Sequence, residues 1–206
     1  MSLPMHPIMQ QSFAVIDREM GDHSFNPREY AIVRRVIHST ADFEFKELIR
    51  FSPSAIDGAI AALQQGVPIV TDVSMVKQGI ASMVAQTFGN PVISAVEQAE
   101  QAEPGKTRTE TGMLRCVDQF PNAIFAIGNA PTALLALCQR LPATQQPTLI
   151  IGAPVGFIAV VESKLALAHT SVPQIRIEGR KGGSPVAAAI VNALLVLAWD
   201  EAVPTG

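Results

Sequence analysis

A titratable imidazole stands beside two permanent positive charges in the run Asn26-Pro-Arg-Glu-Tyr-Ala-Ile-Val-Arg-Arg-Val-Ile-His38. The run begins with a residue suited to a helix cap and then a proline, and it carries an apolar arc at helical spacing. On the opposite face, His38 falls between Arg34 and Arg35. A histidine can exchange a proton near neutral pH, and a guanidinium binds carboxylates. Taken alone, this face favours a solvated surface over a functional site.

Four glycine-containing loops extend this picture, because each follows a predicted strand. Ligands bind outside the carboxyl ends of the strands in an open parallel sheet. Glycine lets the backbone approach a ligand, and the helix that follows presents unpaired N–H groups suited to an anion. Together the loops predict a binding site at this edge. They are Asp72–Gly79, Gly128–Thr132, Gly152–Phe157 and Gly179–Ser184.

The sequence lacks the motifs of several other chemistries. It has no GxGxxG or GxxxxGK[ST] phosphate loop and no GxSxG serine elbow. The four histidines (His6, His23, His38 and His169) show no metal-ligand spacing. What remains is His38, several helix starts and a set of arginines, which predicts a large anionic ligand with acid–base assistance. The arginines are Arg34, Arg35, Arg108 and Arg180. Two guanidiniums disfavour a protonated His38, whereas a bound polycarboxylate favours it.

Composition sets the class of protein. The chain has 206 residues, of which 48% are hydrophobic and 16% charged, and its net charge is −3. These values predict a globular protein and argue against nucleic acid or anionic membranes as partners.

Cys116 and Cys138 show no CxxC pattern, so we expect free thiols. The first residues lack a signal-peptide pattern, and the apolar run Val186–Trp199 is short for a membrane span and contains Asn192. We therefore expect a cytoplasmic protein.

Strands that alternate with helices predict the α/β class, as a three-layer α/β/α arrangement around a mostly parallel, Rossmann-like sheet of five or six strands. We expect one domain over residues 1–206, with a helical segment over about 1–66 and a parallel α/β part over about 67–206. Residues 4–11 are expected to be irregular, residues 12–20 to form a short helix, and residues 41–51 receive no firm assignment. The predicted strands are Val67–Thr71, Pro91–Val96, Ala123–Ile127, Thr148–Ile151 and Gln174–Ile177.

Several segments, in order along nearly the whole chain, resemble the precorrin-8X methylmutase family, which includes cobalt-precorrin-8 methylmutases. Each segment alone is a weak signal, but the ordered set is specific. The segments are Ser12-Phe13, Arg34-Arg-Val-Ile-His38, Asp72-Val-Ser-Met-Val-Lys-Gln-Gly-Ile80, Thr107-Arg108, Ala126-Ile-Gly-Asn-Ala-Pro-Thr-Ala-Leu134, Gly152-Ala-Pro-Val-Gly-Phe157, Glu162-Ser-Lys164 and Gly179-Arg-Lys-Gly-Gly-Ser184.

The resemblance implies an isomerase of cobalamin biosynthesis that moves a methyl group from C-11 to C-12 of a tetrapyrrole. The product is hydrobyrinate, or cobyrinate when the ring carries cobalt. It implies a homodimer, with His38 as the active-site histidine and with Ser12 and Arg35 contacting the substrate. It implies no cofactor and no protein-bound metal. Further substrate contacts are expected from Thr107, Arg108, Asn129, Gly182 and Gly183.

This chemistry agrees with the residues. An intramolecular methyl shift needs a ring held in place and a proton donor, and it needs no nucleophile or second substrate. His38 is the expected acid, Arg35 a clamp for a substrate carboxylate and Ser12 a hydrogen-bond donor, while Arg34 has no assigned role. Two alternatives stay open: a corrinoid carrier that binds without catalysis, and a nucleotide-dependent enzyme on a similar sheet. The sequence does not distinguish a metal-free substrate from a cobalt-bearing one.

Overall fold

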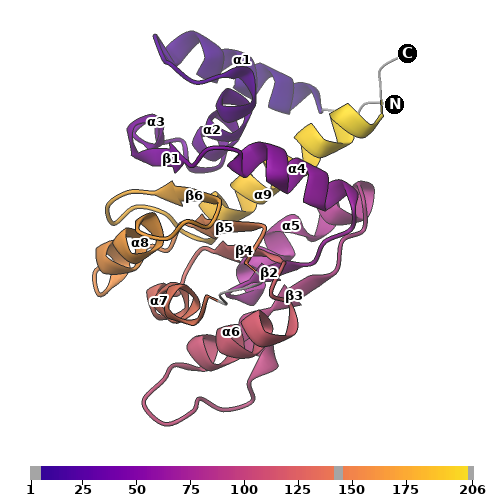
Figure 1. The fold of residues 1–206 in the computed structure, drawn as a ribbon. Coiled ribbons are helices and arrows are strands. Elements are labelled where there is room, and N and C mark those ends of the chain that lie inside the picture. The colour runs from indigo at the N-terminus through magenta and orange to yellow at the C-terminus, as the bar shows by residue number, and fades with distance from the viewer. Residues whose placement is uncertain (1–5, 142–145, 204–206) are drawn as a thin grey trace.

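A six-stranded sheet forms the centre of the molecule in the computed structural model, which describes residues 6–141 and 146–203 (Figure 1). The strand order is β1-β6-β5-β4-β2-β3, and every neighbouring pair is parallel except β1 and β6. This confirms the expected α/β class and the mostly parallel sheet. The strands are β1 (Ile49–Phe51), β2 (Ile69–Thr71), β3 (Val92–Ser94), β4 (Ile124–Ile127), β5 (Leu149–Gly152) and β6 (Gln174–Ile177).

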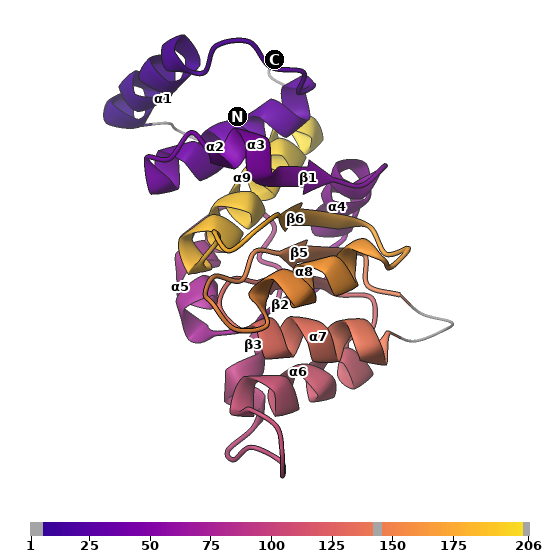
Figure 2. The same cartoon turned by 90° about the vertical axis from the view of Figure 1, so that its left-hand side faces the viewer.

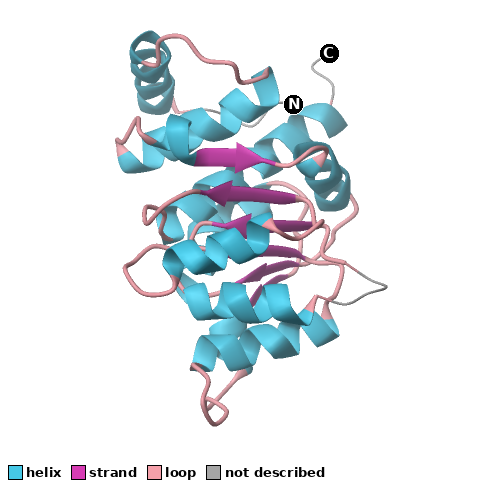
Figure 3. Ribbon diagram, turned by 60° about the vertical axis from the view of Figure 1, so that its left-hand side comes forward, coloured by secondary structure: helices cyan, strands magenta, loops and turns pink. Residues whose placement is uncertain are grey.

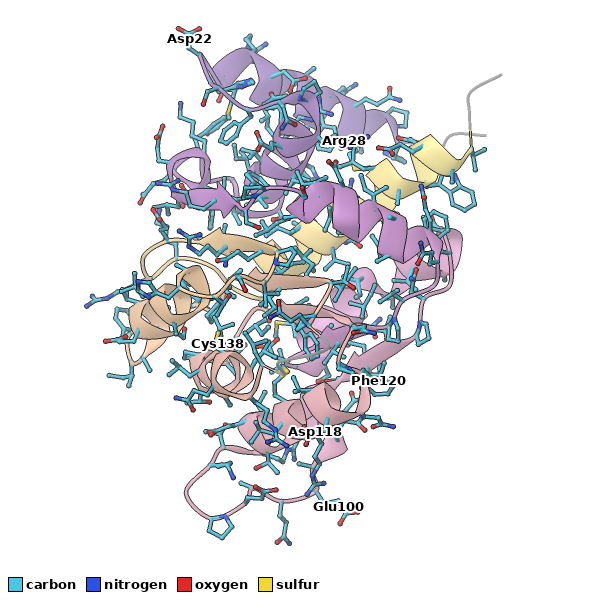
Figure 4. The ribbon with its side chains drawn as sticks, in the orientation of Figure 1. Asp22, Arg28, Glu100, Asp118, Phe120 and Cys138 are labelled. Carbon is cyan, nitrogen blue, oxygen red and sulfur yellow. The ribbon has the colours of Figure 1, made fainter. Side chains whose placement is uncertain are left out.

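Helices cover both faces of the sheet and complete the three layers (Figure 2). One face carries α6, α7 and α8, and the other carries α4, α5 and α9, with α2 packed on α9. Asp118 on α6, labelled in Figure 4, pairs with Arg140 on α7, which ties two neighbouring helices together. The helices are α1 (Pro7–Glu19), α2 (Pro27–Thr40), α3 (Phe45–Leu48), α4 (Ala55–Gln64), α5 (Ser74–Gln86), the 3-10 turn η1 (Ala95–Gln98), α6 (Arg108–Gln119), α7 (Pro131–Arg140), α8 (Val160–Ala168) and α9 (Ser184–Ala202).

The central strands are apolar on both sides because each side meets a helical layer. In β4, Ile124 and Ala126 belong to the core on the α9 side, and Phe125 and Ile127 belong to the core on the α7 side. All four side chains are buried. Alternate residues of a strand point to opposite faces, so a fully apolar strand identifies a sheet covered twice.

The sixth strand comes from the segment that sequence reasoning left unassigned. Residues 41–51 form the short helix α3 and then β1, which pairs antiparallel with β6 through Ile49 opposite Ile177. Figure 3 shows β1 at one edge of the sheet, beside β6. The N-terminal segment expected to be helical therefore also contributes an edge strand.

The first helix begins earlier than expected. It starts at Pro7, and Nδ1 of His6 accepts a hydrogen bond from the backbone N–H of Ile8 at 3.2 Å. A proline at the first helical position, after a residue that can cap, is a common helix start. The expectation of irregular structure was therefore wrong for residues 7–11, and residues 1–5 lie outside the described part. Ser12, the expected first residue of the helix, therefore lies inside it.

The C-terminal helix α9 corrects another expectation. It spans 19 residues and is long and apolar enough to cross a membrane by length and composition alone, so the argument from a short apolar run fails. In this fold, however, α9 packs against α2, α4 and α5 and contributes more buried apolar side chains than any other helix. Its Asn192 amide donates to the carbonyl of Gly79 on α5 at 3.0 Å.

Both cysteines are free thiols, as expected, and they lie on the helical layer formed by α6 and α7. Burial raises the pKa of Cys116 to about 12. Burial likewise raises the pKa of Cys138 to about 11, and this residue is labelled in Figure 4. Neither thiol is therefore activated as a nucleophile at neutral pH.

Candidate functional site

His38 is held by the helix that precedes its own. Ser12 on α1 places its hydroxyl oxygen 2.8 Å from Nδ1 of His38, which lies in the last turn of α2. The Phe13 ring meets the imidazole edge-on, with ring centroids 5.3 Å apart. The carboxyl end of a helix also stabilises a positive charge. Because Nδ1 is engaged, Nε2 is the ring nitrogen available to a ligand.

A cavity of about 400 Å³ opens beside this histidine. Polar groups from α2 meet apolar groups from α1, α5 and α9 around it, and Met75 is strongly exposed at 68%. Such a mixture is typical of a site for a ligand with an apolar body and charged substituents. The lining residues are Met9, Arg35, His38, Ser39, Met75, Gly79, Ser184, Pro185, Ala188 and Ala189.

The two neighbouring arginines have different roles. Arg34 forms an ion pair with Asp17 on α1 at 3.0 Å, and its guanidinium lies 4.4 Å from the centre of the Phe13 ring. Arg34 therefore fastens α1 to α2, which gives it the role that sequence reasoning left open. The helical wheel placed both arginines on one free face, and this was wrong for Arg34.

Arg35 instead lines the cavity as an uncompensated charge. It is partly buried, and no ion pair or hydrogen bond joins it to another residue in ranges 6–141 and 146–203. Burial, and secondarily the charge of Arg34, lowers its pKa. A desolvated guanidinium without an acidic partner is costly, and an anionic ligand removes that cost. Arg35 is accordingly a strong candidate for binding a carboxylate.

The predicted glycine pair shapes one wall of the cavity. Gly183 precedes α9, whose residues Ser184 and Pro185 line the cavity, and its N–H donates to the carbonyl of Ala153 at 2.8 Å. Gly182 has a φ of +154°, and an added Cβ would lie 2.3 Å from the Ala153 carbonyl oxygen. The loop after β6 therefore depends on these glycines to pass close to the loop after β5.

Three predicted contacts do not line the 400 Å³ cavity: Thr107, Arg108 and Asn129. Thr107 caps α6, and its hydroxyl lies 3.1 Å from that of Thr132 at the start of α7. Arg108 is exposed beside it and forms no ion pair with another described residue. The predicted residues thus form two groups, one around His38 and one at the starts of α6 and α7.

Asp72 is a structural centre that sequence reasoning did not assign. Its buried carboxylate accepts backbone N–H groups from Val73, Gly128, Asn129 and Ala130, at 2.7–3.1 Å. Burial raises its pKa, and these four hydrogen bonds counteract that rise. Asp72 therefore holds the loop that carries Asn129. The available signal was a carboxylate placed directly after one buried strand and beside a glycine turn that follows another.

A second hollow of about 370 Å³ lies near the start of α4. Among the residues that line it, the cation Arg28 already pairs with Asp57 and Glu201, so this hollow offers no free positive charge to an anionic ligand. Within ranges 6–141 and 146–203, no group of three or more His, Cys, Asp or Glu residues could hold a metal ion. The cavity with His38 and Arg35 is the better candidate site.

Comparison with known proteins identifies the family of the chain. Residues 7–197 match the family model described as precorrin-8X methylmutase. The chain is 57% identical to a cobalt-precorrin-8 methylmutase of Synechocystis sp., covering 95% of this chain and 97% of that one. It is 37% identical to a precorrin-8X methylmutase of Sinorhizobium sp., covering 91% and 92%. A crystal structure titled as a precorrin-8X methyl mutase from Thermus thermophilus has a TM-score of 0.86 and 39% identity, and covers 97% of this chain and 98% of its own.

Proposed function

Because the chain belongs to the precorrin-8X methylmutase family and is an isomerase of cobalamin biosynthesis, we propose that it moves a methyl group from C-11 to C-12 of one tetrapyrrole substrate. The observation that carries this proposal is the cavity in which His38, oriented by Ser12, stands beside the uncompensated Arg35. The reaction is intramolecular. Catalysis therefore needs positioning and a proton, and the cavity supplies groups for both.

His38 is the proposed proton donor. As an imidazolium it carries two N–H groups, of which Nδ1–H donates to the Ser12 hydroxyl while Nε2–H faces the substrate. Protonation of the conjugated ring system makes it electron-poor and favours migration of the methyl group. Deprotonation of the ring after migration returns the proton to His38, so the histidine finishes in its starting state.

Arg35 is the proposed clamp for a carboxylate near the reacting ring. A tetrapyrrole of this class carries several acetate and propionate groups, and one of them would provide the acid partner that Arg35 lacks. The same substrate carboxylate would also stabilise the imidazolium of His38. In this proposal the substrate itself supplies the charge that makes the acid competent. Thr107, Arg108 and Asn129 would serve carboxylates farther along the ring edge, and Gly182 and Gly183 would offer backbone.

We further propose that the natural substrate carries cobalt. The support is comparative. The Synechocystis relative at 57% identity is named cobalt-precorrin-8 methylmutase, whereas the precorrin-8X methylmutase of Sinorhizobium sp. stands at 37% and the Thermus thermophilus structure at 39%. In this proposal the cobalt belongs to the substrate and not to the protein.

A cytoplasmic homodimer without nucleic-acid or membrane partners is the proposed working form. The dimer part of this proposal is supported by an apolar surface around α8, in which Phe157 and Ile158 are each 83% exposed. Exposed apolar side chains grouped in this way commonly mark an interface between proteins. The surface also includes Val155, Val161 and Leu165. Sedimentation at micromolar concentration tests the dimer, and a Phe157→Asp, Ile158→Asp variant should be monomeric.

Incubation of the purified protein with metal-free precorrin-8X and with cobalt-precorrin-8 tests the function. We expect the absorption spectrum of each reaction mixture to change as substrate is converted to product. We also expect ¹³C NMR of a labelled C-11 methyl group to report its arrival at C-12. The cobalt-bearing substrate should give the higher kcat/KM. Tight binding of either ring without movement of the label would support the carrier instead. The comparisons do not favour that alternative, because the relatives are named as methylmutases.

A further inference from the structure

The loop between β6 and α9 rests on a buried lysine from another helix. Nζ of Lys164 on α8 donates to the carbonyl of Gly179 at 2.8 Å and to the carbonyl of Lys181 at 2.7 Å. The side chain is only 3% exposed. One ammonium thus bonds both ends of the turn that leads to the predicted glycine pair and then to α9.

This ammonium has no acidic partner in the described structure. A cavity of about 110 Å³ beside it is also lined by Arg176 and Glu178. The Glu178 carboxylate, however, already pairs with Arg50 at 2.8 Å and with Arg176 at 3.4 Å. A buried cation held only by carbonyl groups costs stability, and burial lowers the pKa of Lys164 to about 8. Stability alone therefore does not account for a lysine here.

The same loop has a second tether on its exposed side. Nζ of Lys181 contacts the carboxylates of Asp42 and Glu44 at 2.6 Å each, just after the helix that carries His38. The loop is thus fixed at two points, by the buried Lys164 on α8 and by the contact of Lys181 with the residues that follow α2. Between these tethers and the cavity stand only Gly182 and Gly183, followed by Ser184 and Pro185 in its lining.

We propose that Lys164 is a positioning residue for the methylmutase reaction, which holds loop Gly179–Gly183 so that the first turn of α9 keeps its place in the cavity wall. Lys164 contacts neither the cavity that holds His38 nor the ion pair of Arg34. It acts on the substrate only through the loop. This inference rests on the proposed function for its kinetic part, while its structural part stands without it.

The test replaces Lys164 with methionine, which keeps the length of the side chain and removes the donor. Lys46→Met is the matched control, because Nζ of Lys46 also donates to a backbone carbonyl, that of Met20 at 3.1 Å, away from the loop. Two readouts are compared: amide hydrogen exchange of peptides covering residues 178–184, and kcat and KM for cobalt-precorrin-8. If Lys164→Met does not fold, Lys164→Gln and Lys164→Arg are measured in the same way.

In Lys164→Met we expect the rate of amide exchange in the loop to rise by about tenfold or more. We expect KM to rise by about tenfold, whereas kcat should change by less than about threefold. Lys164→Arg, which keeps a cationic donor, should recover part of both effects, and Lys46→Met should show neither. The proposal would be overturned if Lys164→Met left both the exchange of the loop peptides and KM unchanged. It would also be overturned if exchange in the peptides of the sheet rose as much as exchange in the loop, because that result assigns Lys164 a merely structural role. Loop exchange that rises in a protein without methylmutase activity would contradict only the proposed function.

Discussion

The Ser12 hydroxyl lies 2.8 Å from Nδ1 of His38, although the two residues are 26 positions apart and belong to different helices. The position of α1 therefore sets the orientation of the imidazole. Asp17 secures α1 to α2 by accepting from Tyr30 and pairing with Arg34. The geometry of the proposed acid depends on how these two helices pack.

Ser12→Ala should lower kcat by roughly tenfold, because His38 loses the partner that orients its ring. KM for the tetrapyrrole should change much less. Stopped-flow absorption measures the rate, and Ser82→Ala, on the exposed face of α5, is the control that should keep native kinetics. In a His38→Ala background the Ser12 substitution should have no further effect. Additive losses would show that Ser12 acts independently of His38.

Arg35→Met and Arg34→Met form a matched pair of neighbouring substitutions. Arg35→Met should raise the Kd of the substrate by about ten- to a hundredfold and leave the free energy of unfolding unchanged or higher, since it removes an uncompensated charge. Arg34→Met should lower the free energy of unfolding, because it breaks the pair with Asp17. Calorimetric titration and urea unfolding measure the two quantities. Equal effects of both substitutions on affinity would contradict the assignment.

Much of the fold could be predicted because the strands are short, apolar on both faces and separated by helix-length segments. The edge strand β1 could not, since its three residues mix polar and apolar character and it is stabilised by pairing with β6. The early start of α1 was missed because the polar pair Gln10-Gln11 interrupts the apolar pattern. The proline at residue 7, which is the first helical residue, was the signal for the true start.

The site was predictable only in part. His38, Arg35 and Ser12 were found through spacing and resemblance, and the structure brings Ser12 to His38 and places Arg35 in the same cavity. The position of Asp72 after a buried strand offered a signal, but three of its four backbone donors lie more than 50 positions away. The role of Lys164 was not predictable, because its ammonium bonds carbonyls 15 and 17 positions away. Local sequence likewise did not reveal that Arg34 is used in an ion pair, whose partner lies on another helix.

Gly112→Ala and Gly58→Ala should have opposite effects on the free energy of unfolding. A Cβ at Gly112 on α6 would lie 1.8 Å from the carbonyl oxygen of Ala95, whereas one at Gly58 on α4 would meet nothing within 4 Å. We expect Gly112→Ala to destabilise by roughly 3 kcal/mol or more and Gly58→Ala to stabilise by up to about 1 kcal/mol. Urea unfolding compares them. A neutral Gly112→Ala would show that α6 does not pack on η1 as described.

Lys164 should make stability depend on pH in a definite direction. Its native pKa of about 8 lies below the ordinary 10.5, so between these values the unfolded state holds a proton that the native state has released. The contribution of Lys164 to stability should therefore rise with pH across this window, by on the order of 3 kcal/mol. The free energy of unfolding of the wild type minus that of Lys164→Met, measured from pH 7 to pH 10.5, isolates this contribution. A difference that falls with pH would contradict the lowered pKa.

The most direct test of the account compares wild-type protein with His38→Ala on cobalt-precorrin-8, with His169→Ala, an exposed histidine at the end of α8, as control. The His38 variant should move the labelled methyl group about 10²- to 10⁴-fold more slowly, while its Kd for the tetrapyrrole stays within about tenfold of native. The His169 variant should retain the native rate. A His38→Ala protein that transfers the methyl group from C-11 to C-12 at the wild-type rate would contradict the proposed mechanism.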